Sequence, residues 1–243
     1  MNVLKAIPFA VFVLSTLPPI AKHRREMDRA RAEGRDADER EWIRLAENYW
    51  GPKLMGHWGV RLERTDETKL PEGGVLFVAN HDGYGDIPAF MMAVPEKQFG
   101  FVAKEELAKI PVFSKWIVRI RSIMLLRNDP REALKVFAEG EDFLRRGFSL
   151  VICPEGTRAK GQGMKPFQKG SLRMAFRTGV PIVPVAVHGS WDCFEAGGYP
   201  RPGTIRFHVF EPIETAGLPK TEEGAMSERI EAMIRAKIEE WTQ

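Results

Sequence analysis

The stretch from Val75 to Asp86 constrains the fold more than any other part of the sequence, because it joins a buried strand to a polar turn. Residues 75–79 form an apolar run rich in strand-forming side chains, with glycines and a proline before it and turn-forming residues after it. His81 stands where this run ends. Open α/β sheets bind their ligands at such strand ends, so we expect the rest of the chain to be organised around this turn.

His81 and Asp86 are five residues apart, and two of the residues between them, Gly83 and Gly85, allow a tight turn. The carboxylate can therefore fold back onto one imidazole nitrogen and leave the other nitrogen as a base. This is the orienting half of a catalytic triad, but no Gly-x-Ser-x-Gly motif supplies a serine nucleophile. At this point a second interpretation stays open, in which both side chains only satisfy backbone donors of the turn.

Composition narrows the class of protein. A chain of 243 residues can bury a full core, and its length favours one α/β domain with an appendage. The formal net charge of +3 is too small to indicate a nucleic-acid partner. Only Cys153 and Cys193 are present, which excludes a disulfide framework and a cysteine-rich metal site and fits a reducing compartment.

The amino-terminal part contains an uncharged run, residues 6–20, followed by the basic cluster of Lys22, Arg24 and Arg25. As a helix this run would reach about 22 Å, against roughly 30 Å of hydrocarbon in a bilayer. It is too short to span, and no Ala-x-Ala site indicates a cleaved signal peptide. With Pro18-Pro19 expected to end the run, we favour a half-inserted anchor over a plain buried helix.

Residues 22–48 carry eight Lys/Arg and eight Asp/Glu in close alternation, which is typical of one solvated, salt-bridged helix. We expect that helix to break at Gly51-Pro52. Trp42, Trp50 and Trp58 fall nearby, and they fit either a bilayer interface or an ordinary core. We therefore divide the chain into an amino-terminal helical membrane-associating segment, 1–59, and an α/β domain, 60–243.

Periodicity within the α/β domain predicts alternating strands and helices. The expected strands cover residues 60–64, 75–80, 99–103, 122–126, 148–153, 181–187 and 204–212, and the expected helices cover residues 87–94, 111–119, 131–146, 171–178 and 226–241. The predicted fold class is α/β, with a mixed, largely parallel central sheet flanked by helices. His208 is expected to be structural, and for His188 we favour a structural role over a functional one, which stays open.

Four successive strands, counted from the central one, each end in a polar or charged group. These groups are His81 with Asp86, then Lys104, then Arg127, then Glu155 with Arg158. The carboxyl ends of parallel strands share one edge of a sheet, so a base and three cations would converge there. Such a set predicts an anionic substrate with a protonatable group, although any single one of these cations could be a surface ion pair. Lys169 lies in a basic loop before a helix that could add anion-binding dipole.

In this order the blocks resemble the glycerolipid acyltransferases, the 1-acylglycerol-3-phosphate acyltransferase (PlsC) family. The resemblance covers roughly residues 60–212. The blocks that carry it are Asn80-His81-Asp82-Gly83-Tyr84-Gly85-Asp86, Phe101-Val102-Ala103-Lys104, Ile123-Met124-Leu125-Leu126-Arg127, Pro154-Glu155-Gly156-Thr157-Arg158 and Val183-Pro184-Val185-Ala186. The His-x4-Asp pair alone is a weak signal, but its combination with Glu-Gly-Thr-Arg is specific.

The resemblance implies a transferase that moves a fatty acyl group onto the free hydroxyl of a lysophospholipid. It implies that His81 is the general base, Asp86 its orienting partner and Glu155 a brace for the His81 turn. Substrate-binding residues would be Lys104, Arg127, Gly156, Thr157, Arg158 and Lys169. The expected acceptor is 1-acylglycerol-3-phosphate, which gives phosphatidic acid without a covalent enzyme intermediate.

The same resemblance implies partners and a location. Acyl-CoA or acyl-carrier protein would enter as donor substrate, so we expect no cofactor and no metal. The partners would be membrane lipid, the lysophospholipid acceptor and the donor, with no nucleic acid. An enzyme of phospholipid biosynthesis would be membrane-associated at the cytoplasmic face, which agrees with the anchor predicted from length and charge.

Three residues depart from the family pattern: Gly83 stands where Ser or Thr is usual, Leu126 where an acid is usual and Ala159 where Ser is frequent. These departures leave open a different lysolipid acceptor, or a non-catalytic lipid-binding module. A metal-dependent hydrolase that uses His81, Asp82 and Asp86 is a weaker alternative, because the sequence offers no second His/Cys cluster with ligand spacing.

Overall fold

The computed structural model describes residues 3–66, 68–104, 111–125 and 130–243, and within them every predicted strand is confirmed. The strands are β1 (Val60–Arg64), β2 (Leu76–Ala79), β3 (Phe99–Lys104), β4 (Ile123–Leu125), β5 (Ser149–Ile152), β6 (Ile182–His188) and β7 (Gly203–Val209). The α-helices are α1 (Val3–Ala32), α2 (Asp36–His57), α3 (Asp86–Ala93), α4 (Pro111–Arg119), α5 (Pro130–Arg145), α6 (Arg173–Thr178), α7 (Ser190–Phe194) and α8 (Glu223–Thr242).

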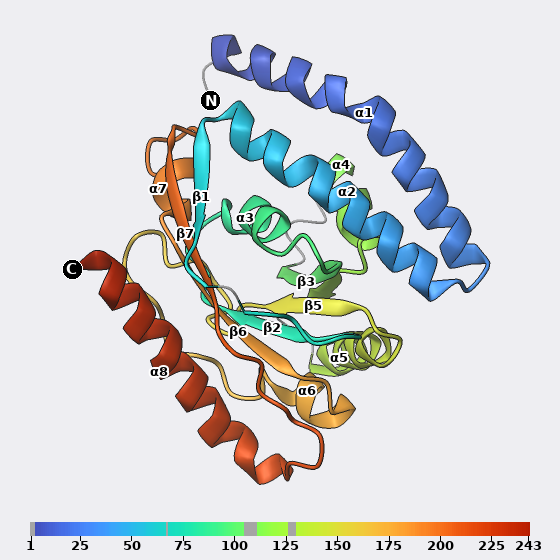
Figure 1. The fold of residues 1–243 in the computed structure, drawn as a ribbon, viewed down its shortest axis with the longest axis vertical. Coiled ribbons are helices and arrows are strands. Elements are labelled where there is room, and N and C mark those ends of the chain that lie inside the picture. Colours follow the sequence, from blue (N-terminus) through green and yellow to red (C-terminus); the bar gives the residue numbers. More distant parts are fainter. Residues whose placement is uncertain (1–2, 67, 105–110, 126–129) are drawn as a thin grey trace.

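The strands form one mixed sheet in the order β1-β7-β6-β2-β5-β3-β4 (Figure 1). Five neighbours, from β6 to β4, are parallel, whereas β7 is antiparallel to β6 and β1 is parallel to β7. β2 therefore lies in the parallel part of the sheet, between β6 and β5. The carboxyl ends of these three strands open on the same edge, which places the segments that follow them around the His81 turn.

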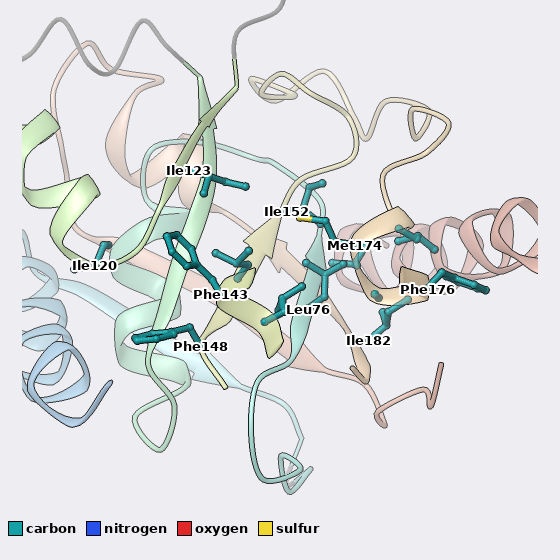
Figure 2. Packing of buried hydrophobic residues seen from close by; sticks show 14 of the residues in the cluster. Leu76, Ile120, Ile123, Phe143, Phe148, Ile152, Met174, Phe176 and Ile182 are labelled. Atoms are coloured by element: carbon teal, nitrogen blue, oxygen red, sulfur yellow. The ribbon is translucent and has the colours of Figure 1, made fainter. Parts of the chain in front are cut away.

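Alternate residues of β2 serve two hydrophobic clusters, one on each face of the sheet. Leu76 and Val78 belong to a cluster that also receives side chains from α5, α6 and α8, and Figure 2 shows part of this packing. Phe77 lies in the other cluster with Phe90 of α3 and Phe207 of β7. All four residues of β2 are buried, which explains why its sequence is apolar throughout.

The prediction of a single helix over residues 22–48 is wrong. α1 ends at Ala32 and the chain reverses through Gly34, which has a left-handed φ of 67° that suits glycine. α2 then runs back along α1, so that the two helices lie side by side (Figure 1). The charged run is not entirely solvated either, because Glu39 is fully buried and binds Arg31 and Arg121.

Two predicted helix breaks are also absent. α1 continues through Pro18-Pro19, and α2 continues through Gly51-Pro52 to His57. Proline has a backbone φ that a helix accepts, and packing against the rest of the molecule outweighs the hydrogen bonds that it removes. At Gly51 the missing side chain serves that packing, because a Cβ there would lie 2.6 Å from Cβ of Met91.

The amino-terminal helices contribute to the core of the domain. Met27 and Ile43 belong to the cluster of Figure 2, and Met55 belongs to the cluster around Phe77. Trp42, Trp50 and Trp58 pack against these clusters, as the core interpretation predicts. None of the helices in the described ranges combines the length and the apolar character that crossing a bilayer requires. The anchor at residues 6–20 and the boundary at residue 59 stay predictions.

Candidate active site

His81 and Asp86 face each other across the turn that follows β2. Nδ1 of His81 lies 2.7 Å from Oδ2 of Asp86, as the five-residue spacing predicts. Asp86 is the first residue of α3 and is 3% exposed, whereas the His81 side chain is 27% exposed. The carboxylate is therefore buried behind the ring, and the imidazole remains accessible from solvent. Because Nδ1 faces the carboxylate, Nε2 is the nitrogen available for proton transfer.

The Asp86 carboxylate also receives hydrogen bonds from the turn and from a distant segment. The backbone amides of Asp82 and Gly83 donate to Oδ2 at 3.0 and 3.3 Å. The hydroxyl of Ser190, the first residue of α7, donates to Oδ1. Ser190 is fully buried. The turn amides and the Ser190 hydroxyl bind the carboxylate from two sides. They therefore hold it in the orientation in which it accepts the hydrogen bond of the His81 ring.

Glu155 connects the turn to β5, the neighbouring strand. Its Oε1 accepts the backbone N–H of His81 at 2.7 Å, and its Oε2 accepts the backbone N–H of Lys165 at 2.7 Å. Burial raises the pKa of the Glu155 carboxyl, while these two hydrogen bonds favour the ionised form. Gly156 follows with a φ of 64°, which permits the sharp turn after β5. The geometry therefore matches a brace between the two turns.

Arg158 lies beside the same turn, but its guanidinium is already engaged. Its Nη1 donates to Oε1 of Glu195, and its Cζ lies 3.8 Å from the ring centroid of Tyr84. The Arg158 side chain is 21% exposed. Arg158 therefore lies at the predicted edge, in a pair that the sequence analysis did not predict. Thr157, between Glu155 and Arg158, is half-buried.

The other predicted cations are placed less fully. Lys104 is the last residue of β3, but its side chain lies outside the described part of the structure, and so does the whole of Arg127. Their strands, β3 and β4, are second and third from β2 in the sheet. Lys169 is exposed on the loop after β5. The roles of these three residues stay predictions.

His188 and His208 are involved in structural contacts. The His188 ring stacks on Trp241 of α8 with the centroids 6.5 Å apart, and Nδ1 of His208 lies 3.0 Å from the hydroxyl of Thr65. Within the described residues, no three His, Cys, Asp or Glu side chains gather closely enough to hold a metal ion.

Three residues at the site were not predicted from the sequence: Ser190, Glu195 and Asp82 in its structural role. Oδ2 of Asp82 accepts the backbone N–H of Trp191 at 3.0 Å, and burial followed by the charge of Asp86 raises the pKa of Asp82. All these contacts depend on the segment after β6. The sequence signal that could have pointed to this segment is the one used for the other strands, because residues 181–187 are an apolar run followed by polar residues. The position of β6 beside β2 is known only from the structure.

A His-Asp pair at the end of a parallel strand, with a glutamate brace and an arginine after the next strand, defines an α/β protein of the acyltransferase class. The chain belongs to the acyltransferase family, because the family model described as Acyltransferase matches residues 61–188. This range begins in β1 and ends with the last residue of β6. Ser190 and Glu195 lie just beyond it.

Individual relatives agree with the family assignment. A chloroplastic 1-acyl-sn-glycerol-3-phosphate acyltransferase of Brassica napus is 30% identical over 141 residues, which are 57% of this chain and 40% of that protein. The chain thus spans less than half the length of this plant relative. The 1-acyl-sn-glycerol-3-phosphate acyltransferase of Pseudomonas aeruginosa is 26% identical over 200 residues, 82% of this chain and 76% of that protein.

A solved structure shares the fold as well. The crystal structure of the 1-acyl-sn-glycerophosphate acyltransferase PlsC from Thermotoga maritima superposes with a TM-score of 0.70 and 26% sequence identity. The superposition covers 85% of this chain and 82% of that one. The likeness includes the mixed sheet that carries the candidate site.

Proposed function

We propose that the protein transfers a fatty acyl group from acyl-CoA or acyl-carrier protein to the free hydroxyl of 1-acylglycerol-3-phosphate, giving phosphatidic acid. The observation that carries this proposal is the 2.7 Å contact between Nδ1 of His81 and Oδ2 of Asp86, in a chain of the acyltransferase family. The plant and bacterial relatives are 1-acyl-sn-glycerol-3-phosphate acyltransferases by name, which supports the same acceptor.

In the proposed reaction, Nε2 of His81 takes the proton of the acceptor hydroxyl while that oxygen attacks the thioester carbonyl. Asp86 holds the ring and stabilises the imidazolium that forms. When the tetrahedral intermediate collapses, the C–S bond breaks and the thiolate takes the proton back from His81. An ester and a free thiol result, and the imidazole returns to its neutral form without a covalent enzyme intermediate.

Binding of the acceptor phosphate is assigned to the cationic side chains at this edge of the sheet, Arg158 first among them. Arginine matches the geometry of a phosphate bidentately, and a fixed phosphate would hold the hydroxyl near His81. Lys104, Arg127 and Lys169 are proposed as further contributors. Since the acceptor is a membrane lipid, the enzyme is proposed to work on the membrane surface.

The test is acyl transfer by the purified full chain, measured by mass spectrometry with lysophosphatidate and each donor in turn. Histidine-to-alanine substitution at position 81 removes the base, so the rate is expected to fall by about 10²–10⁴-fold. The matched control is His208→Ala on β7, which removes a histidine outside the site and is expected to leave the rate near that of the unchanged protein.

Undiminished transfer by folded His81→Ala protein would exclude the mechanism. Binding of lysophosphatidate by the unchanged protein without product from either donor would instead leave a lipid-binding module.

A further inference from the structure

The carboxylate of Glu195 occupies the space between the His81 turn and Arg158. Its Oε2 accepts the backbone N–H of Tyr84 at 2.6 Å, and its Oε1 accepts a hydrogen bond from Nη1 of Arg158. The side chains of Glu195 and Arg158 are only 11% and 21% exposed. A partly desolvated carboxylate thus lies against one guanidinium and one backbone amide.

A guanidinium and a free backbone N–H are also the groups that bind the oxygens of a phosphate ester. Glu195 therefore accepts hydrogen bonds from the same two donors, Arg158 and the Tyr84 N–H, that an anionic headgroup would need. The Nη1–H of Arg158 that donates to Oε1 of Glu195 cannot make a full hydrogen bond to the carboxylate and to a phosphate at the same time. A phosphate that binds Arg158 through this donor has to displace the Glu195 carboxylate.

Gly83 makes room for this arrangement. A Cβ at position 83 would lie 2.9 Å from Oε2 of Glu195, and 2.8 Å from the backbone nitrogen of Trp191. Both distances are shorter than real side chains tolerate, so even alanine would push the segment after β6 away from the turn. The glycine at position 83 and the carboxylate at position 195 therefore belong to one local structure.

The backbone that carries Glu195 is held firmly, so displacement does not require unfolding. The N–H of Glu195 donates to the carbonyl of Trp191 at 2.8 Å, and the N–H of Trp191 donates to Asp82 at 3.0 Å. Ser190, at the start of α7, the short helix that ends just before Glu195, donates a hydrogen bond to Asp86. With this backbone fixed, rotation about the side-chain torsions of Glu195 is sufficient to release Arg158.

We propose that Glu195 is a specificity-determining residue, an internal anion that competes with the headgroup of the acceptor for Arg158 and the Tyr84 N–H. A headgroup that takes this Nη1 donor and the Tyr84 N–H must replace the carboxylate, so Glu195 raises the concentration at which phosphorylated acceptors bind. This inference rests on the proposed function in that it takes the ligand of Arg158 to be the phosphate of the acceptor.

The experiment measures binding of glycerol 3-phosphate, the headgroup without its acyl chain, by phosphorus NMR titration of the full chain. Glu195→Gln removes the charge but keeps an oxygen for the Tyr84 N–H. It is expected to tighten binding by about three- to tenfold, the range that corresponds to losing one partly exposed competing ion pair. The double variant with Arg158→Ala is expected to lose this gain.

The matched control is Asp192→Asn, which removes a carboxylate of α7 three residues before Glu195; this side chain is 63% exposed and lies 3.9 Å from Arg201. It is expected to leave the affinity unchanged. Equal tightening in Asp192→Asn would reduce the effect to long-range electrostatics and overturn the proposal. Unchanged or weaker binding in Glu195→Gln would overturn it too, because Glu195 would then only position Arg158.

Turnover gives a second readout. The KM for lysophosphatidate is expected to fall by the same factor in Glu195→Gln while kcat stays constant. A fall in kcat with constant KM would contradict competition for the headgroup. Because the binding titration needs no turnover, a protein that binds glycerol 3-phosphate as expected but transfers no acyl group would remove the proposed function and leave this inference standing.

Discussion

At the scale of single residues, the site is defined by two carboxylates, Asp86 and Glu155, whose oxygens all accept hydrogen bonds. Asp86 serves an imidazole, two backbone amides and the hydroxyl of Ser190, and Glu155 serves two backbone amides from different turns. Each of these carboxylate oxygens therefore has a hydrogen-bond partner before any substrate arrives. In the proposed reaction, this preorganisation keeps the cost of aligning His81 out of the proton-transfer step.

Glu155→Gln tests the brace. A glutamine has one acceptor oxygen, so either the His81 N–H or the Lys165 N–H loses its partner and faces an amide N–H₂ group instead. We expect the free energy of unfolding to fall by about 1–3 kcal/mol, as for other buried unsatisfied donors, and kcat to fall as well. Urea denaturation and the transfer assay, carried out well below the new midpoint, measure the two effects.

Glu141→Gln on α5 is the control, because it also neutralises a buried carboxylate, one that pairs with Arg177 at 3.2 Å outside the site. It is expected to lower stability without lowering kcat. A Glu155→Gln enzyme with full kcat would show that the His81 turn holds its shape without the brace.

The His81–Asp86 contact could be predicted because both residues lie in one short turn with glycines between them. The contacts of Glu195 could not, because Tyr84 and Arg158 are 111 and 37 residues away along the chain. No spacing rule relates a carboxylate after one strand to an arginine after another. Only the order of strands in the sheet brings them together.

At the scale of elements, α2 carries a buried acid against β3. Glu47 is 1% exposed, its Oε2 accepts the N–H of Phe99 at 3.4 Å, and its Oε1 has no partner among the described residues. Burial raises the pKa of Glu47 well above its ordinary value of 4.5. The folded protein therefore keeps this proton at pH values where the unfolded chain has lost it.

The sign of the pH effect follows from this difference. As the pH rises above about 4.5, the folded state binds more protons than the unfolded state, so Glu47 lowers stability progressively until its folded pKa is passed. Glu47→Gln has no proton to lose. At pH 8 we expect the variant to have a higher melting temperature than the unchanged protein, by about 2–4 °C for each ~1 kcal/mol gained in the free energy of unfolding. At pH 4 we expect the two melting temperatures to be nearly equal.

Glu41→Gln on the same helix is the comparison, because Glu41 is exposed and pairs with Arg44. No gain at pH 8 is expected there. If Glu47→Gln raised the melting temperature equally at pH 4 and pH 8, the gain would come from something other than ionisation.

The elements themselves were largely predictable, because apolar runs of strand length and helical periodicity are local signals. The errors fall where tertiary packing outweighs a local signal. Gly51-Pro52 is a helix breaker in isolation, yet α2 runs through it because Gly51 permits contact with Met91. Gly34, which does follow the end of a helix, has a weaker local signal because no proline comes after it, and no heavy atom lies within 4 Å of a Cβ added there.

At the scale of the whole molecule, the order of strands could not be read from the sequence. Alternation of strands and helices predicts a largely parallel sheet, but many strand orders satisfy it. The observed order places β6 beside β2. In the sequence, 102 residues lie between Ala79, the last residue of β2, and Ile182, the first residue of β6. For that reason the contribution of the segment after β6 was overlooked.

Membrane association is the prediction that belongs to this scale. Lys22, Arg24 and Arg25 are exposed on α1, next to the uncharged run. Each basic residue near an anionic surface adds about 1 kcal/mol of attraction. Replacing all three with glutamine is expected to weaken binding to vesicles of equal parts phosphatidylglycerol and phosphatidylcholine by about 10²-fold, measured by co-sedimentation at low salt.

The control replaces Arg61, Lys69 and Lys220, three exposed basic residues outside α1, and is expected to change vesicle binding little. Equal weakening by both triple variants would mean that the overall charge of the protein, and not α1, attracts the surface. If none of the six substitutions changed vesicle binding, the uncharged run 6–20 would be the anchor without help from the basic residues.

The strand order also has a consequence for synthesis on the ribosome. His81 and Asp86 leave the ribosome early, but Glu155 and Arg158 follow β5, and Ser190 and Glu195 follow β6. A nascent chain that has reached β4 already contains His81 and Asp86, but it still lacks Glu155 and Ser190, whose hydrogen bonds hold this turn in the folded protein. The complete site must therefore form late during translation, and a chain released too early would lack the contacts that hold the His81 turn.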